Sequence, residues 1–252
     1  MTRFPYIAIV AFICSLWMTL LPGLAFPANA VDNGIYAELL QKYVKNGVVN
    51  YAGFKSEEDK LDRYLSILES TDTKSLPRNA QFALYINAYN AYTIKLILSG
   101  YPGLNSIKDL GSLLQSPWKK KIVRIDGKVI SLDDLEHSIL RPRFKDPRVH
   151  FAINCASKGC PPLRFEPYRG DSLDRQLDDA TRSFLNNPKN FRLEGDKFYV
   201  SKIFDWFGED FNNDVLGFYL KYANDELKQE LQKRKGSLRI DYLDYDWSLN
   251  GV

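Results

Sequence analysis

Residues 79–99 constrain the fold more than any other part of this 252-residue chain. Their side chains are apolar or aromatic on nearly every face that a helix would present. The segment includes Phe82, Tyr85, Ile86, Tyr89 and Ile97. A helix that is hydrophobic all round is normally buried at the centre of a domain. We therefore expect residues 79–99 to form a buried central helix.

Two amides interrupt this apolar segment. Asn87 and Asn90 are three residues apart, so they are neighbours on one surface of the helix. Buried amides need hydrogen-bond partners. We expect these side chains to tie loops or adjacent backbone to the helix. The alternative is that one amide faces a substrate carbonyl.

The remaining segments combine helices with short hairpins. Helical patterns cover residues 33–46, 55–69, 172–186 and 214–234, with a break at Asn46-Gly47 after the first. Hairpin patterns cover residues 120–130 and 191–200, and the alternating residues 240–250 are strand-like. Since no βαβ rhythm is present, the pattern predicts an α+β fold. We expect a single compact domain with a buried central helix, several amphipathic helices and a small, mainly antiparallel sheet.

Residues 1–30 have the features of a cleaved signal peptide. Arg3 supplies a positive charge, residues 6–21 are apolar, and residues 28–30 (Ala-Asn-Ala) match a small-residue cleavage site. The apolar stretch is shorter than the ~20 residues that a transmembrane helix needs. We predict that residues 31–252 form the mature domain. It is expected to be secreted or periplasmic, without membrane association after cleavage.

Length and charge narrow the classes of partner. The predicted mature chain is long enough for one domain with a sizeable core. The net charge of the whole chain is only +3, and no strongly basic face is visible in the sequence. Nothing here resembles a nucleic-acid-binding footprint. An oxidising compartment would permit a disulfide.

Residues 148–163 hold the most reactive side chains. They contain one of the two histidines, His150, and two of the three cysteines, Cys155 and Cys160. The apolar residues 149–153 predict a short buried strand, which Gly159 and the following prolines end in a loop. Reactive groups at a strand end are common in enzymes.

A carboxylate stands out on the helix that we expect after the hairpin at 120–130. Ser131 is a plausible N-cap with Asp134 three residues on, close to a capping box. An apolar stripe follows, formed by Leu132, Leu135, Ile139 and Leu140. Glu136 projects from within this stripe, whereas His137 points toward the polar side. A carboxylate on a core face is costly unless it is paired or hydrogen-bonded.

Together these residues predict a thiol enzyme acting on amide or ester bonds, either a hydrolase or an acyltransferase. Cys155 would be the nucleophile, His150 its base, and Glu136 the carboxylate that holds the imidazole. In a strand, residues five apart point to opposite faces, so His150 and Cys155 can meet only if the backbone turns near Asn154. The oxyanion would be stabilised by Asn154, Asn87 or a backbone N–H after the turn. The substrate would be peptide-like or acyl, and no cofactor is expected.

Three alternatives stay open at this point. Cys155 and Cys160 could form a disulfide in a non-enzymatic binding module. His150 could be buried and satisfied by a carboxylate without catalysis. Zinc bound by His150, Cys155 and Cys160 is disfavoured because no Cys-x-x-Cys motif or second histidine cluster accompanies them. We therefore predict no metal site.

Blocks spread over nearly the whole predicted mature chain resemble the DUF547 family, which is named for its unknown function. They are residues 82–90 (FALYINAYN), 132–137 (LDDLEH), 149–155 (VHFAINC) through 160–163 (CPPL), and 245–250 (YDWSLN). The resemblance implies that the characteristic positions are Asn87, Asn90, Glu136, His137, His150, Cys155, Cys160 and Asp246. By analogy such a set suggests a papain- or transglutaminase-like Cys-His-acid site. The acid-His-Cys order differs from the Cys-first order of papain-like enzymes, so a relation would require a permuted chain or convergence.

Overall fold

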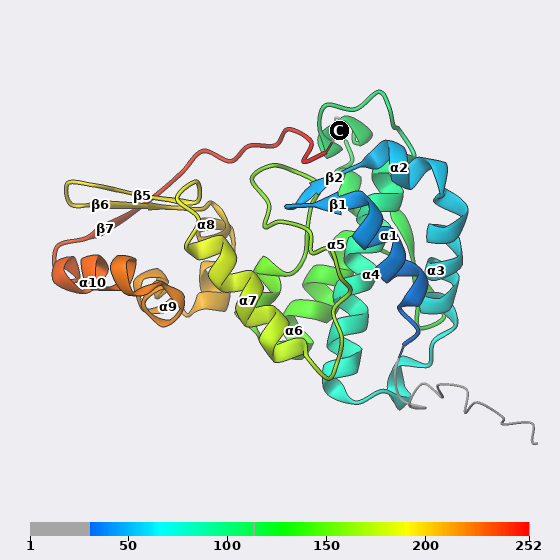
Figure 1. The fold of residues 1–252 in the computed structure, drawn as a ribbon, viewed down its shortest axis with the longest axis horizontal. Helices are drawn as coiled ribbons and strands as arrows, with labels where there is room; N and C mark the ends of the chain where they lie inside the picture. The colour runs from blue at the N-terminus through cyan, green and yellow to red at the C-terminus, as the bar shows by residue number, and fades with distance from the viewer. Residues whose placement is uncertain (1–30, 113, 252) are drawn as a thin grey trace, which may run out of the picture.

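Helix α4 (Arg78–Leu98) is the central element of the larger part of the molecule (Figure 1). The computed structural model describes residues 31–112 and 114–251, so the predicted signal peptide lies outside the described residues. From Phe82 to Leu98 every side chain of α4 except Lys95 is buried. The predicted buried central helix is therefore confirmed.

The N-terminal helices cover one side of α4. They are α1 (Gly34–Tyr43), α2 (Tyr51–Ser56) and α3 (Glu58–Ser70). Helices α2 and α3 contact α4, and α1 packs on both of them. The predicted break at Asn46-Gly47 is the turn of a small hairpin, β1 (Val44–Lys45) and β2 (Val48–Val49). At this turn Gly47 has φ of 80°, and a Cβ atom there would lie 2.5 Å from Cβ of Pro162. The turn therefore packs directly against the loop that carries the cysteines.

The predicted hairpin at 120–130 is present and leads into an irregular helix. Strands β3 (Lys121–Ile125) and β4 (Lys128–Ser131) are antiparallel. The helix consists of α5 (Leu132–Asp134), the π-helical turn η4 (Leu135–Leu140) and α6 (Arg141–Phe144). Short 3₁₀ turns elsewhere are η1 (Thr73–Ser75), η2 (Ile107–Leu110) and η3 (Pro117–Lys119). The capping box of Ser131 and Asp134 is confirmed.

A proline explains the π-helical turn. Pro142 lacks the N–H that an α-helix would donate to the carbonyl of Ser138, and its ring would crowd that carbonyl. The chain widens instead, so that the N–H of Arg141 reaches the carbonyl of Glu136. Such single wide turns often occur at functional sites, and this one carries Glu136 and His137.

The predicted strand at 149–153 is wrong. These residues lie at the end of a 3₁₀ helix, η5 (Pro147–Phe151), whose N-terminus is capped by the Asp146 carboxylate. Val149 belongs to the core around α4, whereas Phe151 belongs to a second core. A short apolar run indicates burial, but it does not distinguish a buried strand from a buried helical turn.

The second core is rich in aromatic side chains. It lies among elements that appear together on the left of Figure 1: α7 (Leu173–Leu185), β5 (Phe191–Glu194), β6 (Lys197–Val200), α8 (Ile203–Trp206), η6 (Gly208–Phe211), α9 (Val215–Tyr222), α10 (Asp225–Arg234) and β7 (Arg239–Tyr242). Strand β6 pairs antiparallel with β5, as the predicted hairpin requires, and parallel with β7. The predicted helix at 214–234 is divided, because Asn224 caps the start of α10.

The C-terminal segment returns to the core around α4. Of the strand-like residues 240–250, only residues 240–242 belong to a named strand, β7. The chain then crosses back (red in Figure 1), and Leu249 forms a bridge with Ser157. Backbone carbonyls of Asp246 and Ser248 accept hydrogen bonds from Gly159 and Lys158. This crossing places the residues around Trp247 against the cysteine loop. The whole is an α+β fold, as predicted.

Two negative findings concern the described residues only. None of their helices is both long and apolar enough to span a bilayer. They also contain no cluster of three histidine, cysteine or acidic side chains arranged to hold a metal ion.

Candidate functional site

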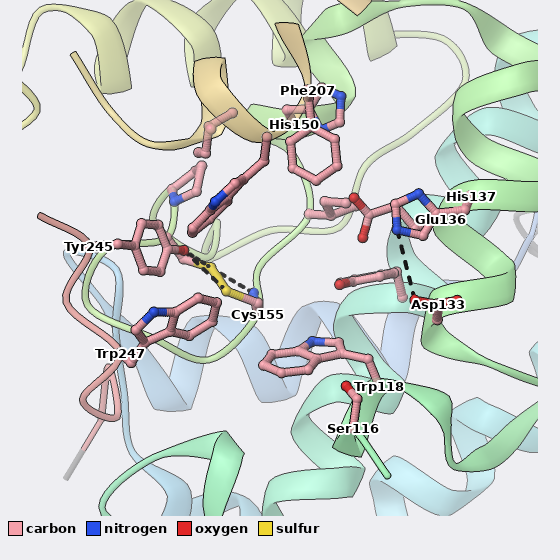
Figure 2. A pocket seen from close by; sticks show the side chains of 16 residues that line it. Ser116, Trp118, Asp133, Glu136, His137, His150, Cys155, Phe207, Tyr245 and Trp247 are labelled. Carbon is pink, nitrogen blue, oxygen red and sulfur yellow. Dashed lines mark hydrogen bonds and ion pairs between the residues drawn. A yellow bond between two sulfur atoms is a disulfide. The ribbon is translucent and has the colours of Figure 1, made fainter. Parts of the chain in front are cut away.

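A cleft of about 200 Å³ brings together residues from distant parts of the chain (Figure 2). Its polar lining includes Glu136 and His137 of η4, His150 of η5, and Cys155. Six aromatic side chains also line it: Tyr89, Trp118, Trp206, Phe207, Tyr245 and Trp247. The three residues predicted to be catalytic, Cys155, His150 and Glu136, therefore all line this one cleft.

Cys155 and Cys160 form a disulfide, with Cα atoms 6.2 Å apart. The backbone makes the turn after Asn154 that the sequence argument required, since Ala156 has φ of 63°. Within this turn the Cys155 N–H lies 2.9 Å from Sγ of Cys160. The disulfide is the pairing that the sequence offered as an alternative to a free thiol.

The hydroxyl of Tyr245 contacts both sulfur atoms. It lies 3.3 Å from Sγ of Cys155, 3.2 Å from Sγ of Cys160 and 3.2 Å from Oγ of Ser157. Burial raises the pKa of Tyr245 to about 12, so this phenol stays protonated and can donate a hydrogen bond at neutral pH.

His150 is buried and held by a carboxylate. Its Nε2 lies 2.7 Å from Oδ2 of Asp210, and its ring stacks on Phe207 with centroids 4.1 Å apart. Burial lowers the pKa of His150, although the Asp210 carboxylate opposes this shift. Burial acts to raise the pKa of Asp210, but hydrogen bonds with His150 and Arg141 outweigh it and hold that pKa well below its usual range. A neutral imidazole beside an ionised carboxylate is the state expected of a general base.

The carboxylate that holds His150 is therefore Asp210, in place of the expected Glu136. Arg141 fixes Asp210 in turn, with Nε 2.6 Å from Oδ2. Sequence reasoning missed Asp210 because it lies 60 residues beyond His150 and is one of 31 acidic residues. No local pattern marks it as the partner of a buried histidine.

Glu136 is buried, as its place in the apolar stripe predicted, with only 8% of its surface exposed. Burial raises the pKa of Glu136 to about 7, and the neighbouring Tyr89 hydroxyl partly opposes the shift. Among the described residues its carboxylate forms no ion pair. In Figure 2 it lies at the side of the cavity between Trp118 and Phe207.

His137 lies at the rim of the cleft and faces solvent, as predicted. Its Nε2 is 3.9 Å from Oδ1 of Asp133, and its Nδ1 accepts a hydrogen bond of 2.9 Å from Arg141. The more exposed position makes His137 a useful control for His150.

The two amides of α4, Asn87 and Asn90, brace the fold. Asn87 exchanges two hydrogen bonds with the backbone of Tyr168. Asn90 donates to the Ala152 carbonyl and accepts from the Asn154 N–H. The bracing role expected for Asn87 and Asn90 is therefore confirmed.

The oxyanion role expected for Asn154 or Asn87 does not fit this geometry, because neither residue lines the cleft. The Asn154 side chain donates to the Pro161 carbonyl and accepts from the Ala156 N–H and from Asn250. Its polar atoms stabilise the cysteine loop from within.

Asp246 also has a local structural role. Its carboxylate accepts hydrogen bonds from the backbone and hydroxyl of Ser248, while its carbonyl accepts from Gly159. These bonds hold the C-terminal segment against the cysteine loop.

Residues 73–185 match the model of a protein family described as "Protein of unknown function, DUF547". Residues 73–185 therefore contain a DUF547 domain, in agreement with the resemblance of the sequence blocks in this part of the chain. No curated protein and no solved structure matches the chain. The matched residues include Glu136, His150 and both cysteines of the cleft. Asp210 and Tyr245 come from the part of the chain that follows the match.

Proposed function

We propose that this protein is a thiol-dependent acyl hydrolase or acyltransferase whose nucleophile is Cys155 in the reduced state. The observation that carries the proposal is that Cys155 and the Asp210-held His150 line the same cleft. An activated nucleophile needs a base, and the base is commonly oriented by a third group. Asp210 takes the orienting role that the sequence assigned to Glu136.

The tautomer of His150 suits this role. Because Asp210 is ionised, the ring proton belongs on Nε2, where it donates to Oδ2 at 2.7 Å. This leaves Nδ1 unprotonated, and Nδ1 has no hydrogen-bond partner among the described residues. Nδ1 is therefore the atom that would accept the thiol proton.

Two hydrogen-bond donors near Cys155 could stabilise the oxyanion in place of Asn154 and Asn87. One is the backbone N–H of Cys155, which points to Sγ of Cys160 in the disulfide form. The other is the Tyr245 hydroxyl, 3.3 Å from Sγ of Cys155. Both are fixed before the reaction, which is the condition for strong electrostatic stabilisation.

The reaction begins with reduction of the disulfide. A dithiol supplies two electrons and two protons and becomes a disulfide itself, leaving both cysteines as thiols. His150 Nδ1 takes the Cys155 proton, and the thiolate attacks the acyl carbon. The carbon–nitrogen or carbon–oxygen bond then breaks, and the leaving group takes the proton from His150. Water, or a second amine or alcohol, then attacks the thioester carbon while His150 accepts its proton. The carbon–sulfur bond breaks, and the released Cys155 thiolate takes the proton from His150, which restores the starting thiol.

The test uses mature protein carrying Cys160→Ser, termed the single-cysteine protein, which cannot form the disulfide. Incubation with p-nitrophenyl acetate should release nitrophenolate and leave an acetyl group on Cys155, located by peptide mass spectrometry. His150→Ala in this background should abolish acetylation, whereas His137→Ala should retain it. A folded single-cysteine protein that takes up no acetyl group would refute the proposal.

A second function, a binding module with Cys155–Cys160 as a structural staple, is favoured by the closed disulfide itself. It predicts that air-oxidised protein has a mass about two daltons below the reduced value, since disulfide formation removes two hydrogens. It also predicts that treatment of the folded protein with a dithiol does not open the bond. If a dithiol reduces the disulfide readily and the protein keeps its fold, the enzyme is favoured over the binding module.

We also propose that the chain is exported to an oxidising compartment, because its first 30 residues have a signal-peptide pattern. Expression in a bacterial host followed by N-terminal sequencing of the periplasmic fraction should give a chain beginning at Val31. A chain retained in the cytoplasm with Met1 intact would contradict export.

A further inference from the structure

The cleft contains a buried carboxylate without a counter-ion. Glu136 is more than nine-tenths buried and forms no ion pair among the described residues, although the neighbouring Tyr89 hydroxyl favours its ionised form. An ionised carboxylate in such a position is costly unless a cation joins it. A carboxyl group of this kind in a cleft is a candidate for ligand recognition.

The nearby cations are already engaged. Arg141 pairs with Asp210 and Glu209. Lys108 lies 3.7 Å from the ring centroid of Trp247. Neither residue lines the cleft. The acidic lining residues are Glu136 and Asp133, so the cleft disfavours an anionic ligand.

Six of the residues that line the cleft are aromatic. Trp247 contacts three other rings of the cleft, with centroid distances of 5.8 Å to Trp118, 5.6 Å to Trp206 and 4.6 Å to Tyr245. We call these four residues the aromatic wall. The chain has four tryptophans, of which one lies in residues 1–30 and the other three belong to this wall.

We infer that the cleft binds the ammonium group of a small organic cation, with Glu136 as its counter-ion and the aromatic wall packed around it. Tryptophan and tyrosine faces attract cations, and aromatic cages bind quaternary ammonium groups. A volume of about 200 Å³ suits a head group, with the rest of the ligand at the open side. If the cation is part of a substrate, that substrate is an acyl donor that carries an ammonium group, and this part of the inference rests on the proposed function. Binding alone does not require catalysis.

The affinity should depend on pH through Glu136. Its charged and titratable neighbours are Tyr89 on α4, Asp133 on α5, His137 on η4, Arg141 on α6, His150 on η5, Asp210 on η6, and Tyr245. The pKa of Glu136 is about 7, so the carboxyl is mostly protonated at pH 6 and mostly ionised at pH 8. If only the ionised form binds a cation, the affinity rises about tenfold over this range.

The test measures binding of choline to the disulfide-closed mature protein by tryptophan fluorescence and calorimetry. Choline keeps its charge at every pH, and 3,3-dimethyl-1-butanol is its neutral analogue of the same shape. We expect choline to bind at least about tenfold more tightly than the alcohol at pH 8. Choline affinity should also fall about tenfold at pH 6.

Matched variants separate the contributions. Glu136→Gln should remove both the preference for choline and its pH dependence, whereas Glu226→Gln, at an exposed position outside the cleft, should retain them. Trp118→Leu should weaken choline binding while retaining the pH dependence. Equal binding of choline and the alcohol, pH-independent binding, or no choline binding at pH 8 would overturn the inference.

Failure of this inference can be distinguished from failure of the proposed function. The disulfide-closed protein has no free thiol, so its choline binding reports only on the cleft. A protein that binds choline but never acquires an acetyl group keeps the cation site and loses the enzyme. A protein that is acetylated but does not bind choline supports the enzyme and contradicts the cation site.

Discussion

Burial of Glu136 should make the protein less stable as the pH rises, and Glu136→Gln should remove this effect. Burial raises the pKa of Glu136 from 4.5 to about 7. The folded state therefore holds its proton more tightly than the unfolded state does. A group of this kind lowers the free energy of unfolding progressively between pH 4.5 and 7.

The size of the effect follows from the pKa difference. Each pKa unit corresponds to about 1.4 kcal/mol. At pH 8 the ionised carboxylate destabilises the fold by about 3 kcal/mol, whereas at pH 5 the effect is about 1 kcal/mol. Glutamine keeps the shape and removes the charge. Glu136→Gln should therefore stabilise the protein by about 2 kcal/mol more at pH 8 than at pH 5.

Urea denaturation at the two pH values measures this difference. With a slope of about 1–3 kcal/mol per molar urea, the variant's midpoint should exceed the wild-type midpoint at pH 8 by about 1 M or more. Glu226→Gln, at an exposed position, is the control and should show no such pH-dependent gain. Identical pH profiles for wild type and Glu136→Gln would refute the reasoning.

Three further predictions concern the cysteine loop and the histidine. Asn154→Ala should lower the free energy of unfolding by about 2–4 kcal/mol in urea denaturation, because three buried hydrogen bonds are lost; a loss below about 0.5 kcal/mol would contradict the bracing role. Gly47→Ala should cost about 1 kcal/mol or more by the same measurement, because φ is 80° and the new Cβ would meet Pro162; unchanged stability would show that the turn can shift. Asp210→Asn in the single-cysteine protein should slow alkylation of Cys155 by iodoacetamide about tenfold or more, because the imidazole loses its orienting carboxylate; an unchanged rate would remove Asp210 from the site.

Much of the fold could be predicted because it depends on local patterns. The all-round apolar character of residues 79–99 indicated the central helix, and the patterns at residues 120–130 and 191–200 indicated the two hairpins. Residues 149–153 were mistaken for a strand because a short apolar run is buried in either conformation. The parallel pairing of β7 with β6 could not be predicted, because it joins segments that are distant in the sequence.

The candidate site was only half predictable for the same reason. The polar residues that stand out against an apolar background, Glu136 and His150, do line the cleft. Their pairing was predicted wrongly, because a hydrogen bond to Asp210 depends on how η6 packs against η5. Tyr245 and Trp247 were predicted to lie in a strand-like segment and in a block that resembles the DUF547 family, but neither pattern placed them at the site. Their place beside the disulfide follows from the return of the C-terminal segment.

The most direct test of the thiol chemistry is the rate of Cys155 alkylation as a function of pH in the single-cysteine protein. An imidazole that takes the thiol proton makes the thiolate available well below the pKa of about 8.5 of a free cysteine. We expect labelling to be rapid already at pH 6–7 and to fall sharply in His150→Ala, while His137→Ala behaves as the parent. Rates that rise only near the pKa of an ordinary thiol, and that are the same with and without His150, would contradict the proposed function.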